Sequence, residues 1–172
     1  MQVTSIQVVI MGVSGSGKST VAALLAGRTG CALAEGDDFH CAANIARLAE
    51  GKPLDDARRA PWLAALACWL TERVTRDECA VLSCSALTRA YRDVLRGAGS
   101  TVRMVHLAGP RELVVRRLAV RHGHFMAPEL LDSQYAELEP LDGDEPGITV
   151  GLAQRPARIV DQILHALGPP RT

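Results

Sequence analysis

A short segment near the start of the chain combines three glycines with a lysine that is followed directly by a serine. The stretch reads Gly12-Val13-Ser14-Gly15-Ser16-Gly17-Lys18-Ser19-Thr20, which matches the pattern G-x-x-x-x-G-K-[ST]. In this pattern backbone N–H groups surround phosphate, the lysine adds charge beside it, and the hydroxyl is placed to bind Mg²⁺. The spacing therefore predicts a nucleotide site with Lys18 as a catalytic charge and Ser19 as metal ligand. A dinucleotide-binding fingerprint would need glycine where Thr20 stands.

A second polar group follows the next apolar run, 31–34, and contains Asp37, Asp38 and His40. If a helix begins near Asp37, then Asp37, His40 and Asn44 lie on one helical face. Asp37 is a candidate to orient or deprotonate an attacking hydroxyl in phosphoryl transfer, and a helix N-cap is the alternative. For His40 taken alone, a half-buried structural role is the simpler interpretation.

Two arginines end a later helical pattern, just before a glycine-containing break. Arg117 and Arg121 are four residues apart and therefore share a helical face. Phosphoryl transfer needs positive charge over the γ-phosphate and a segment that closes to exclude water. We therefore predict a lid over about residues 121–137, with Arg117 or Arg121 contacting the nucleotide.

Strand-like and helix-like segments alternate along the whole chain, which predicts an α/β protein with a parallel sheet covered on both faces. The expected strands are 2–11, 31–34, 79–84, 102–107 and 148–152, and the expected helices are 17–29, 39–50, one opening at Pro61, 87–96, 110–121, 129–138 and 156–167. With the glycine motif, this pattern indicates one domain, 1–172, with the three-layer P-loop NTPase fold. Ligands of such sheets bind beyond the carboxyl ends of the strands.

Composition narrows the partners of the chain. It has 172 residues, with 19 basic and 19 acidic side chains and a formal net charge of zero, which argues against nucleic-acid or membrane binding. No apolar stretch approaches the ~20 residues of a membrane helix, and the N-terminus does not resemble a secretory signal. Five cysteines without a C-x-x-C pair predict reduced thiols, no zinc site and a cytoplasmic location. The oligomeric state stays open, with a homodimer among the states allowed.

Several further segments together carry a family resemblance. They are Met11–Ser19; Gly36-Asp37 with His40 and Asn44; Gly51 with Pro53-Leu54; Asp56, Arg59 and Pro61-Trp62-Leu63; Cys84-Ser85-Ala86-Leu87 with Tyr91-Arg92-Asp93 and Leu95-Arg96; Arg117-Leu118, Arg121 and Gly123-His124-Phe125; and Leu131 with Gln134. Nearly end to end, the chain resembles the small gluconate kinases, P-loop kinases related in fold to shikimate kinase and the nucleoside-monophosphate kinases.

The resemblance implies ATP-dependent phosphorylation of D-gluconate on its 6-hydroxyl, giving 6-phosphogluconate and ADP. It implies that the glycine loop and Ser19 hold ATP and Mg²⁺, and that Arg117 and the turn containing Arg155 and Pro156 flank the adenine. Catalytic roles fall to Lys18, Asp37 and Arg121. The implied substrate-binding residues are Asp37, His40, Arg59, Ser85, Ala86, Arg92, His124 and Gln134. By analogy with shikimate kinase, Arg59 and Arg92 are the candidates for the substrate carboxylate.

Two alternatives stay open: a kinase of the same fold for another small hydroxylated acid, and a nucleotide-binding module without turnover. The chain also departs from the family pattern. Arg58 stands where the family usually has aspartate, Thr88-Arg89 replaces a lysine-rich pair, and Gly151 or Ala153 replaces an acidic residue. The first departure reverses a charge near the expected substrate pocket and could therefore alter substrate preference.

Overall fold

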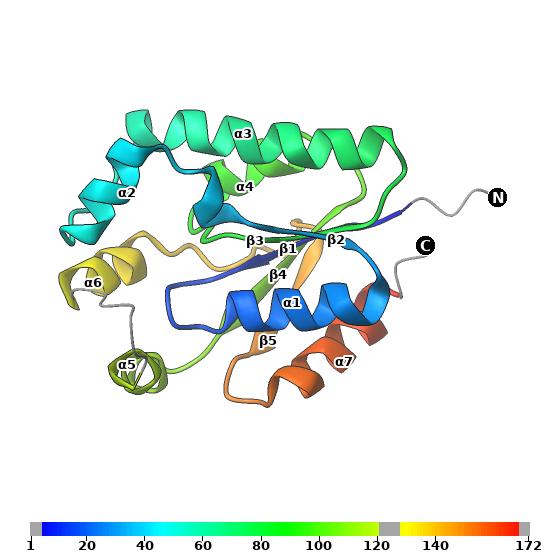
Figure 1. Ribbon diagram of the computed structural model, residues 1–172. Coiled ribbons are helices and arrows are strands. Elements are labelled where there is room, and N and C mark those ends of the chain that lie inside the picture. Colours follow the sequence, from blue (N-terminus) through cyan, green and yellow to red (C-terminus); the bar gives the residue numbers. More distant parts are fainter. Residues whose placement is uncertain (1–4, 121–127, 169–172) are drawn as a thin grey trace.

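A five-stranded, all-parallel sheet forms the centre of the molecule (Figure 1). The computed structural model describes residues 5–120 and 128–168. The strands are β1 Gln7–Met11, β2 Ala32–Glu35, β3 Ala80–Ser83, β4 Val102–Ala108 and β5 Gly147–Gly151, and they lie in the order β2-β3-β1-β4-β5. The predicted fold class is confirmed. β1 lies at the centre, and all five of its residues are buried, as expected of a parallel strand covered on both faces.

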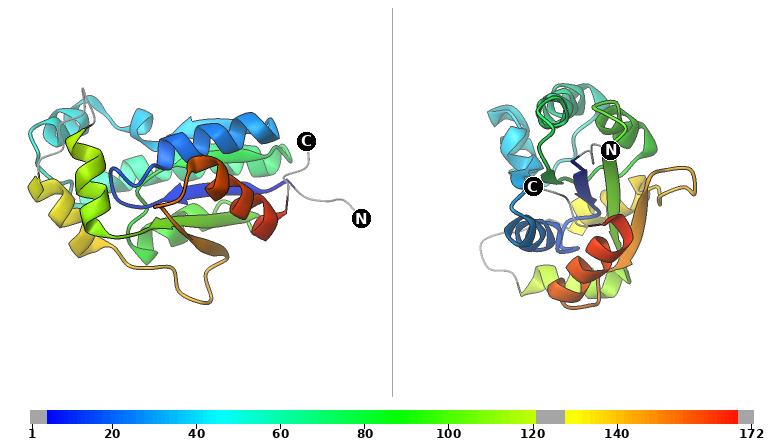
Figure 2. Two further views of the ribbon diagram at one scale, coloured as in Figure 1. Left: turned by 90° about the horizontal axis from the view of Figure 1, so that it is seen from below. Right: turned by 90° about the vertical axis from the view of Figure 1, so that its right-hand side faces the viewer.

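Helices cover both faces of this sheet (Figures 1 and 2). They are α1 Lys18–Thr29, the 3₁₀ helix η1 Gly36–Phe39, α2 Ala42–Ala49, α3 Asp56–Thr75, α4 Arg89–Arg96, α5 Arg111–Ala119, α6 Pro128–Glu137 and α7 Pro156–Leu167. Alternate side chains of β1 enter two separate cores. Val8 and Ile10 pack with residues of α1 and α7, whereas Val9 and Met11 pack with residues of α3 and α4. No helix in the described part of the chain could span a membrane.

Two predicted helices differ from the structure. α3 begins at Asp56 rather than at Pro61, because the Asp55 side chain accepts from the Arg58 N–H and caps the helix there. Pro61 lies inside this helix. The predicted helix 39–50 is interrupted at His40, whose ψ of 140° is extended, so Asp37 and Asn44 do not share a helical face. The N–H group of the Asn44 side chain donates to the Arg58 carbonyl instead.

The prediction of five reduced thiols was wrong for one pair, because Cys31 and Cys79 form a disulfide. These cysteines directly precede β2 and β3, whose parallel register pairs Ala32 with Ala80. The register therefore brings together two Cα atoms, 4.9 Å apart, that are separated by 48 positions in the sequence. The remaining cysteines are unpaired: Cys41 and Cys68 are exposed and Cys84 is buried. The cytoplasmic location stays a prediction.

Candidate active site

The glycine loop follows β1 at the carboxyl edge of the sheet, where the fold predicts ligands to bind. Gly15 and Gly17 have φ values of +79° and +99°, a region that favours glycine. A Cβ atom on Gly15 would lie 2.8 Å from Cγ of Leu118, so α5 packs directly against the loop. Gly17 is the N-cap of α1, which starts at Lys18. The N–H groups of the first helical turn thus lie beside those of the loop, an arrangement suited to phosphate.

Lys18 and Ser19 lie beside further oxygen atoms. Lys18 Nζ donates to the Val13 carbonyl at 2.9 Å, and Ser19 Oγ donates to Glu35 Oε2 at 3.0 Å. A serine hydroxyl and a carboxylate are the hard oxygen donors that Mg²⁺ prefers, so the residues present fit this ion. Glu35 was not among the predicted site residues. Its position at the end of a short apolar strand, two residues before Asp37, is the sequence signal that could have identified it.

Asp37 lies in η1, directly after β2, and is exposed. It caps neither neighbouring helix, because Glu35 precedes η1 and Cys41 precedes α2. The buried thiol of Cys84, after β3, is close enough to Lys18 and Asp37 for both charges to affect its pKa. Burial has the largest influence and raises the pKa of this thiol to about 12. Ser19, next to Lys18, also donates to Glu35, two residues before Asp37, so the glycine loop and the candidate catalytic carboxylate lie in one neighbourhood.

His40 lies on an aromatic surface beside Asp37. Its ring stacks on the indole of Trp62, with the ring centroids 4.6 Å apart and the planes 12° from parallel. The Trp62 Nε1–H donates to the Gly36 carbonyl at 2.7 Å, which ties α3 to η1. Burial lowers the pKa of His40, whereas the nearby Asp37 carboxylate acts in the opposite direction. The imidazole is therefore neutral at pH 7 and can donate or accept a hydrogen bond.

Arg59 lies in α3, and its charge adds to the lowering of the pKa of His40. Its Nη1 donates to the Tyr91 hydroxyl at 2.6 Å and lies 2.8 Å from Glu137 Oε2. The neighbouring Arg58, which carries the unusual charge, forms an ion pair with Asp55 at the start of the same helix. The positive charge of Arg58 is thus balanced locally.

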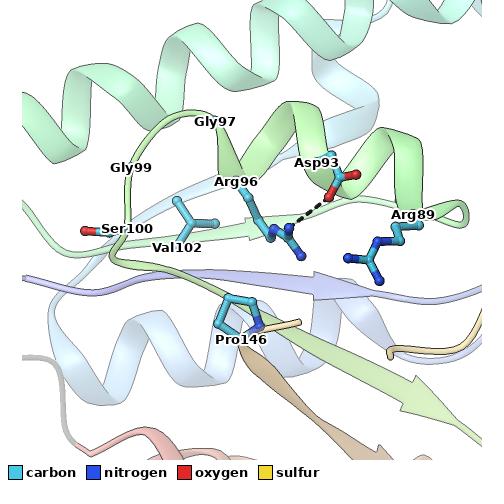
Figure 3. Close-up of a pocket in the computed structure, with 8 residues that line it drawn as sticks. All are labelled: Arg89, Asp93, Arg96, Gly97, Gly99, Ser100, Val102 and Pro146. Atoms are coloured by element: carbon cyan, nitrogen blue, oxygen red, sulfur yellow. Dashed lines mark ion pairs between the residues drawn. The ribbon is translucent and has the colours of Figure 1, made fainter. Parts of the chain in front are cut away.

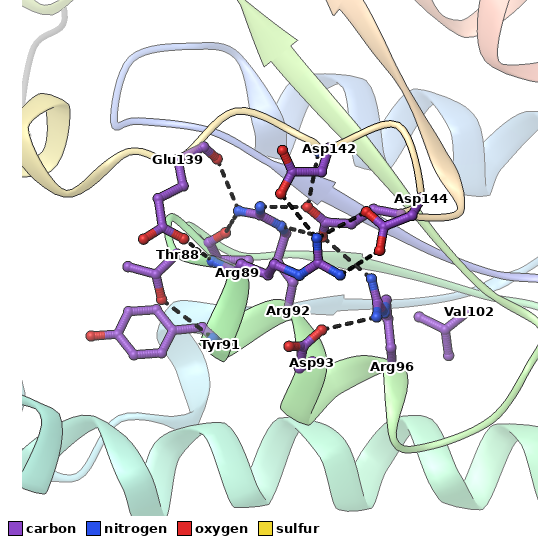
Figure 4. A network of polar contacts seen from close by, with 12 residues as sticks. Thr88, Arg89, Tyr91, Arg92, Asp93, Arg96, Val102, Glu139, Asp142 and Asp144 are labelled. Atoms are coloured by element: carbon purple, nitrogen blue, oxygen red, sulfur yellow. Dashed lines mark hydrogen bonds and ion pairs between the residues drawn. The ribbon is translucent and has the colours of Figure 1, made fainter.

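Arg92 is enclosed by groups of the protein itself, contrary to the substrate-binding role that the resemblance implied. Its side chain is fully buried against Glu145, with Nε and Nη2 each 2.7 Å from a carboxylate oxygen. Nη1 donates to the carbonyls of Ala86, Leu87 and Glu139, and Nη2 also donates to Pro140. With all three nitrogens occupied inside the protein, Arg92 has a structural role. It anchors the segment before β5 to α4 (Figure 4).

The residues after β3 contribute mainly backbone. Ser85 is partly exposed and accepts from the Gly12 N–H through its carbonyl at 3.2 Å, so it touches the glycine loop. Ala86 is buried, and its φ of +43° is rare for a residue with a Cβ atom. This conformation lets the Ala86 carbonyl accept from the buried Arg92. Ser85 thus contacts the glycine loop through its backbone, whereas the Ala86 side chain is buried.

α5, α6 and α7 contribute residues around the loop. Arg117 donates to the carbonyls of Ser16 and Leu152, at 3.3 and 2.6 Å, and so lies between the glycine loop and the segment after β5. Arg155 and Pro156 begin α7 just beyond Leu152. The Gln134 side chain of α6 contacts Ser14: its Oε1 accepts from the backbone N–H at 2.7 Å. Arg121 and His124 lie outside the described residues, and their roles stay predictions.

A separate surface hollow of about 450 Å³ lies beside α4 (Figure 3). Its lining residues are Arg89, Asp93, Arg96, Gly97, Gly99, Ser100, Val102 and Pro146. None of them is a predicted site residue. Arg89 and Arg96 are both engaged with acidic side chains, Arg89 with Asp142 and Asp144 and Arg96 with Asp93, so the hollow carries little unpaired charge (Figure 4).

A glycine loop with its lysine and serine, and a carboxylate in the same neighbourhood, define a P-loop phosphotransferase that uses ATP. The family described as "AAA domain" matches residues 8–141. A gluconokinase from Gluconobacter oxydans is 45% identical over 91% of this chain and 88% of its own. The chain belongs to the gluconokinase family.

Solved structures agree with this assignment. A sugar kinase from Janibacter sp. HTCC2649, solved without ligand, is 45% identical, with a TM-score of 0.90 over 96% of each chain. A gluconokinase from Sinorhizobium meliloti 1021 is 41% identical, with a TM-score of 0.85 over 96% of this chain and 93% of its own. The resemblance identified from the sequence is therefore confirmed.

Proposed function

We propose that this chain transfers the γ-phosphoryl group of ATP to the 6-hydroxyl of D-gluconate, giving 6-phospho-D-gluconate and ADP. The observation that carries the proposal is the contact of the glycine loop with the segment of Asp37, in a chain of the gluconokinase family: Ser19, next to Lys18, donates to Glu35, two residues before Asp37. A module that only binds nucleotide has no need of an exposed carboxylate beside its glycine loop.

On the nucleotide side, the loop N–H groups hold the β- and γ-phosphates, and Lys18 neutralises charge that develops during transfer. Lys18 must then exchange its bond to Val13 for phosphate oxygen. Ser19 and Glu35 are the residues that would hold Mg²⁺, which shields the phosphate charge when bound. Arg117, which lies between the loop and the segment before α7, contacts the adenine.

On the acceptor side, Asp37 accepts the proton of the attacking hydroxyl and orients the hydroxyl oxygen toward the γ-phosphorus. His40, held flat against Trp62, is a neutral hydrogen-bonding partner for sugar hydroxyls. Arg59 provides a planar fork that suits a carboxylate. Phosphoryl transfer then joins the 6-oxygen to phosphorus and breaks the bond to the ADP oxygen.

The proposal is tested by measuring ADP release with Mg²⁺ and ATP across gluconate, shikimate, neutral sugars and nucleoside monophosphates. We expect turnover with gluconate to exceed that with every other acceptor, and the product to carry phosphate on C6. A higher kcat/KM with shikimate or another acid would favour the alternative of a different acid kinase. ATP binding without any turnover would favour the non-catalytic alternative.

A further inference from the structure

Glu137, in the last turn of α6, has no role in the reaction as described so far. Its carboxylate lies against the end of the Arg59 guanidinium: Oε2 is 2.8 Å from Nη1, and Oε1 accepts from Nη2 at 3.2 Å. The pair is thus held by one hydrogen bond, through Oε1, and by the close approach of Oε2, at terminal nitrogens that an incoming carboxylate can also use. The side chains of Arg59 and Glu137 are only 15% and 30% exposed, so solvent screens the pair incompletely.

Glu137 and a second partner both contact the terminal nitrogens of Arg59. Nη1 also donates to the Tyr91 hydroxyl, which in turn donates to Asp56. Around Arg59 the described carboxylates are therefore Glu137 by direct contact and Asp56 through Tyr91. An anionic acceptor that left both in place would meet more negative than positive charge. Glu137 therefore occupies the terminal fork of Arg59, one of the two forks through which a guanidinium can bind a carboxylate.

A second contact connects this helix to the nucleotide loop. Gln134, one turn earlier in α6, accepts from the Ser14 N–H, and its Nε2 lies 3.3 Å from Ser14 Oγ. One face of α6 therefore touches both the glycine loop and Arg59, at the end of the molecule where α2, α5 and α6 gather (Figures 1 and 2).

We propose that Glu137 is an internal competitor for the acceptor carboxylate and thereby sets acceptor specificity. It occupies Arg59 while the acceptor site is empty, and a sugar acid binds by replacing it. A neutral polyol of the same length has no carboxylate to replace Glu137, so removing the charge of Glu137 should not raise its affinity. The inference rests on the proposed function in taking the acceptor to be a sugar acid.

The test compares Glu137→Gln with Glu129→Gln, a matched loss of charge on an exposed residue in the first turn of α6. Removing a competing, partly exposed ion pair should lower both KM and the calorimetric Kd for gluconate by about five- to tenfold, with kcat changed less than about twofold. Binding of the neutral analogue D-glucitol should not change. Glu129→Gln should behave like the unaltered chain. In an Arg59→Ala background, Glu137→Gln should have no effect on gluconate binding.

The outcomes separate the two proposals. A higher KM for gluconate in Glu137→Gln would mean that Glu137 orients Arg59 for the substrate, which overturns the competition. An unchanged Kd for gluconate, or a gain in gluconate affinity that persists in the Arg59→Ala background, also overturns the competition. An unaltered chain that neither binds nor phosphorylates gluconate refutes the proposed function itself.

Discussion

Replacing Arg92 with methionine is expected to destabilise the fold without weakening gluconate binding. Removing one partner of a buried ion pair costs about 3–5 kcal/mol, because the other charge is left without compensation. Here Glu145 keeps some compensation, since Arg96 Nη1 lies 3.4 Å from its Oε2 and the Asp142 N–H donates to its Oε1 at 3.1 Å. We therefore expect the lower end, about 3 kcal/mol, which corresponds to a fall in Tm of about 6–12 °C for a chain of this size.

The measurement is urea unfolding of the unaltered chain, Arg92→Met and Arg92→Met/Glu145→Gln. The double variant removes the uncompensated charge and should recover part of the loss. The dependence of the free energy of unfolding on pH, at acid pH, provides a second test. Hydrogen bonds from Arg92 hold the pKa of Glu145 below its usual value of 4.5, so this stabilisation is complete above that pH and is lost as the pH falls through the lower folded-state pKa. Arg92→Met should flatten this dependence.

The reasoning would be refuted by an Arg92→Met chain that unfolds at the same urea concentration as the unaltered one but shows a KM for gluconate raised tenfold or more. That result would place Arg92 on the substrate, as the analogy with shikimate kinase implied. Folded Arg92→Met with a normal KM would instead confirm the structural role.

Three further predictions concern the loop, the carboxylate and the disulfide. Lys18→Ala should lower kcat by several powers of ten, because the transferring phosphoryl group loses its nearest charge; ADP release at saturating ATP measures this, and near-normal turnover would contradict the role. Asp37→Asn should lower kcat with ATP affinity and Tm nearly unchanged, since Asp37 caps no helix, and a large loss of Tm would restore the capping interpretation. Reducing the Cys31–Cys79 bond, which closes a loop of 48 positions, should lower the free energy of unfolding by about 4 kcal/mol, whereas equal urea midpoints with and without reductant would show that the bond contributes nothing.

Local signals in the sequence were sufficient for the sheet and most helices. The apolar run before Gly12 predicted a doubly covered strand, and β1 is buried along its whole length. Helix starts were harder, because two signals competed at α3. Pro61 suits a first turn, but Asp55 caps the helix six positions earlier, and Pro61 lies in the second turn, where it cannot donate a backbone hydrogen bond to Ala57.

Contacts between distant segments could not be predicted in the same way. The disulfide depends on the register of β2 against β3, which no local pattern reveals. The same limit applies to arginine. Arg59 and Arg92 both follow family motifs, yet only the fold shows that Glu145, 53 positions along the chain, encloses the guanidinium of Arg92. Arg59 instead stays partly exposed, in contact with Tyr91 and Glu137.

The same argument explains why a kinase of this size places its acceptor arginine under a helix. An arginine open to water would bind any anion, including a phosphate of ATP, and would lose affinity to screening by salt. The contacts with Tyr91 and Glu137 keep the Arg59 guanidinium oriented and its charge neutralised until the acceptor carboxylate binds. Gln134 of α6 also accepts a hydrogen bond from Ser14. The replacement of Glu137 by the acceptor carboxylate at Arg59 and the conformation of the glycine loop therefore both affect the position of α6. We therefore expect binding of the acid and the conformation of the loop to be coupled through α6. Gln134→Ala should weaken that coupling while leaving the affinity for gluconate alone unchanged, as calorimetry with and without a non-hydrolysable ATP analogue would measure.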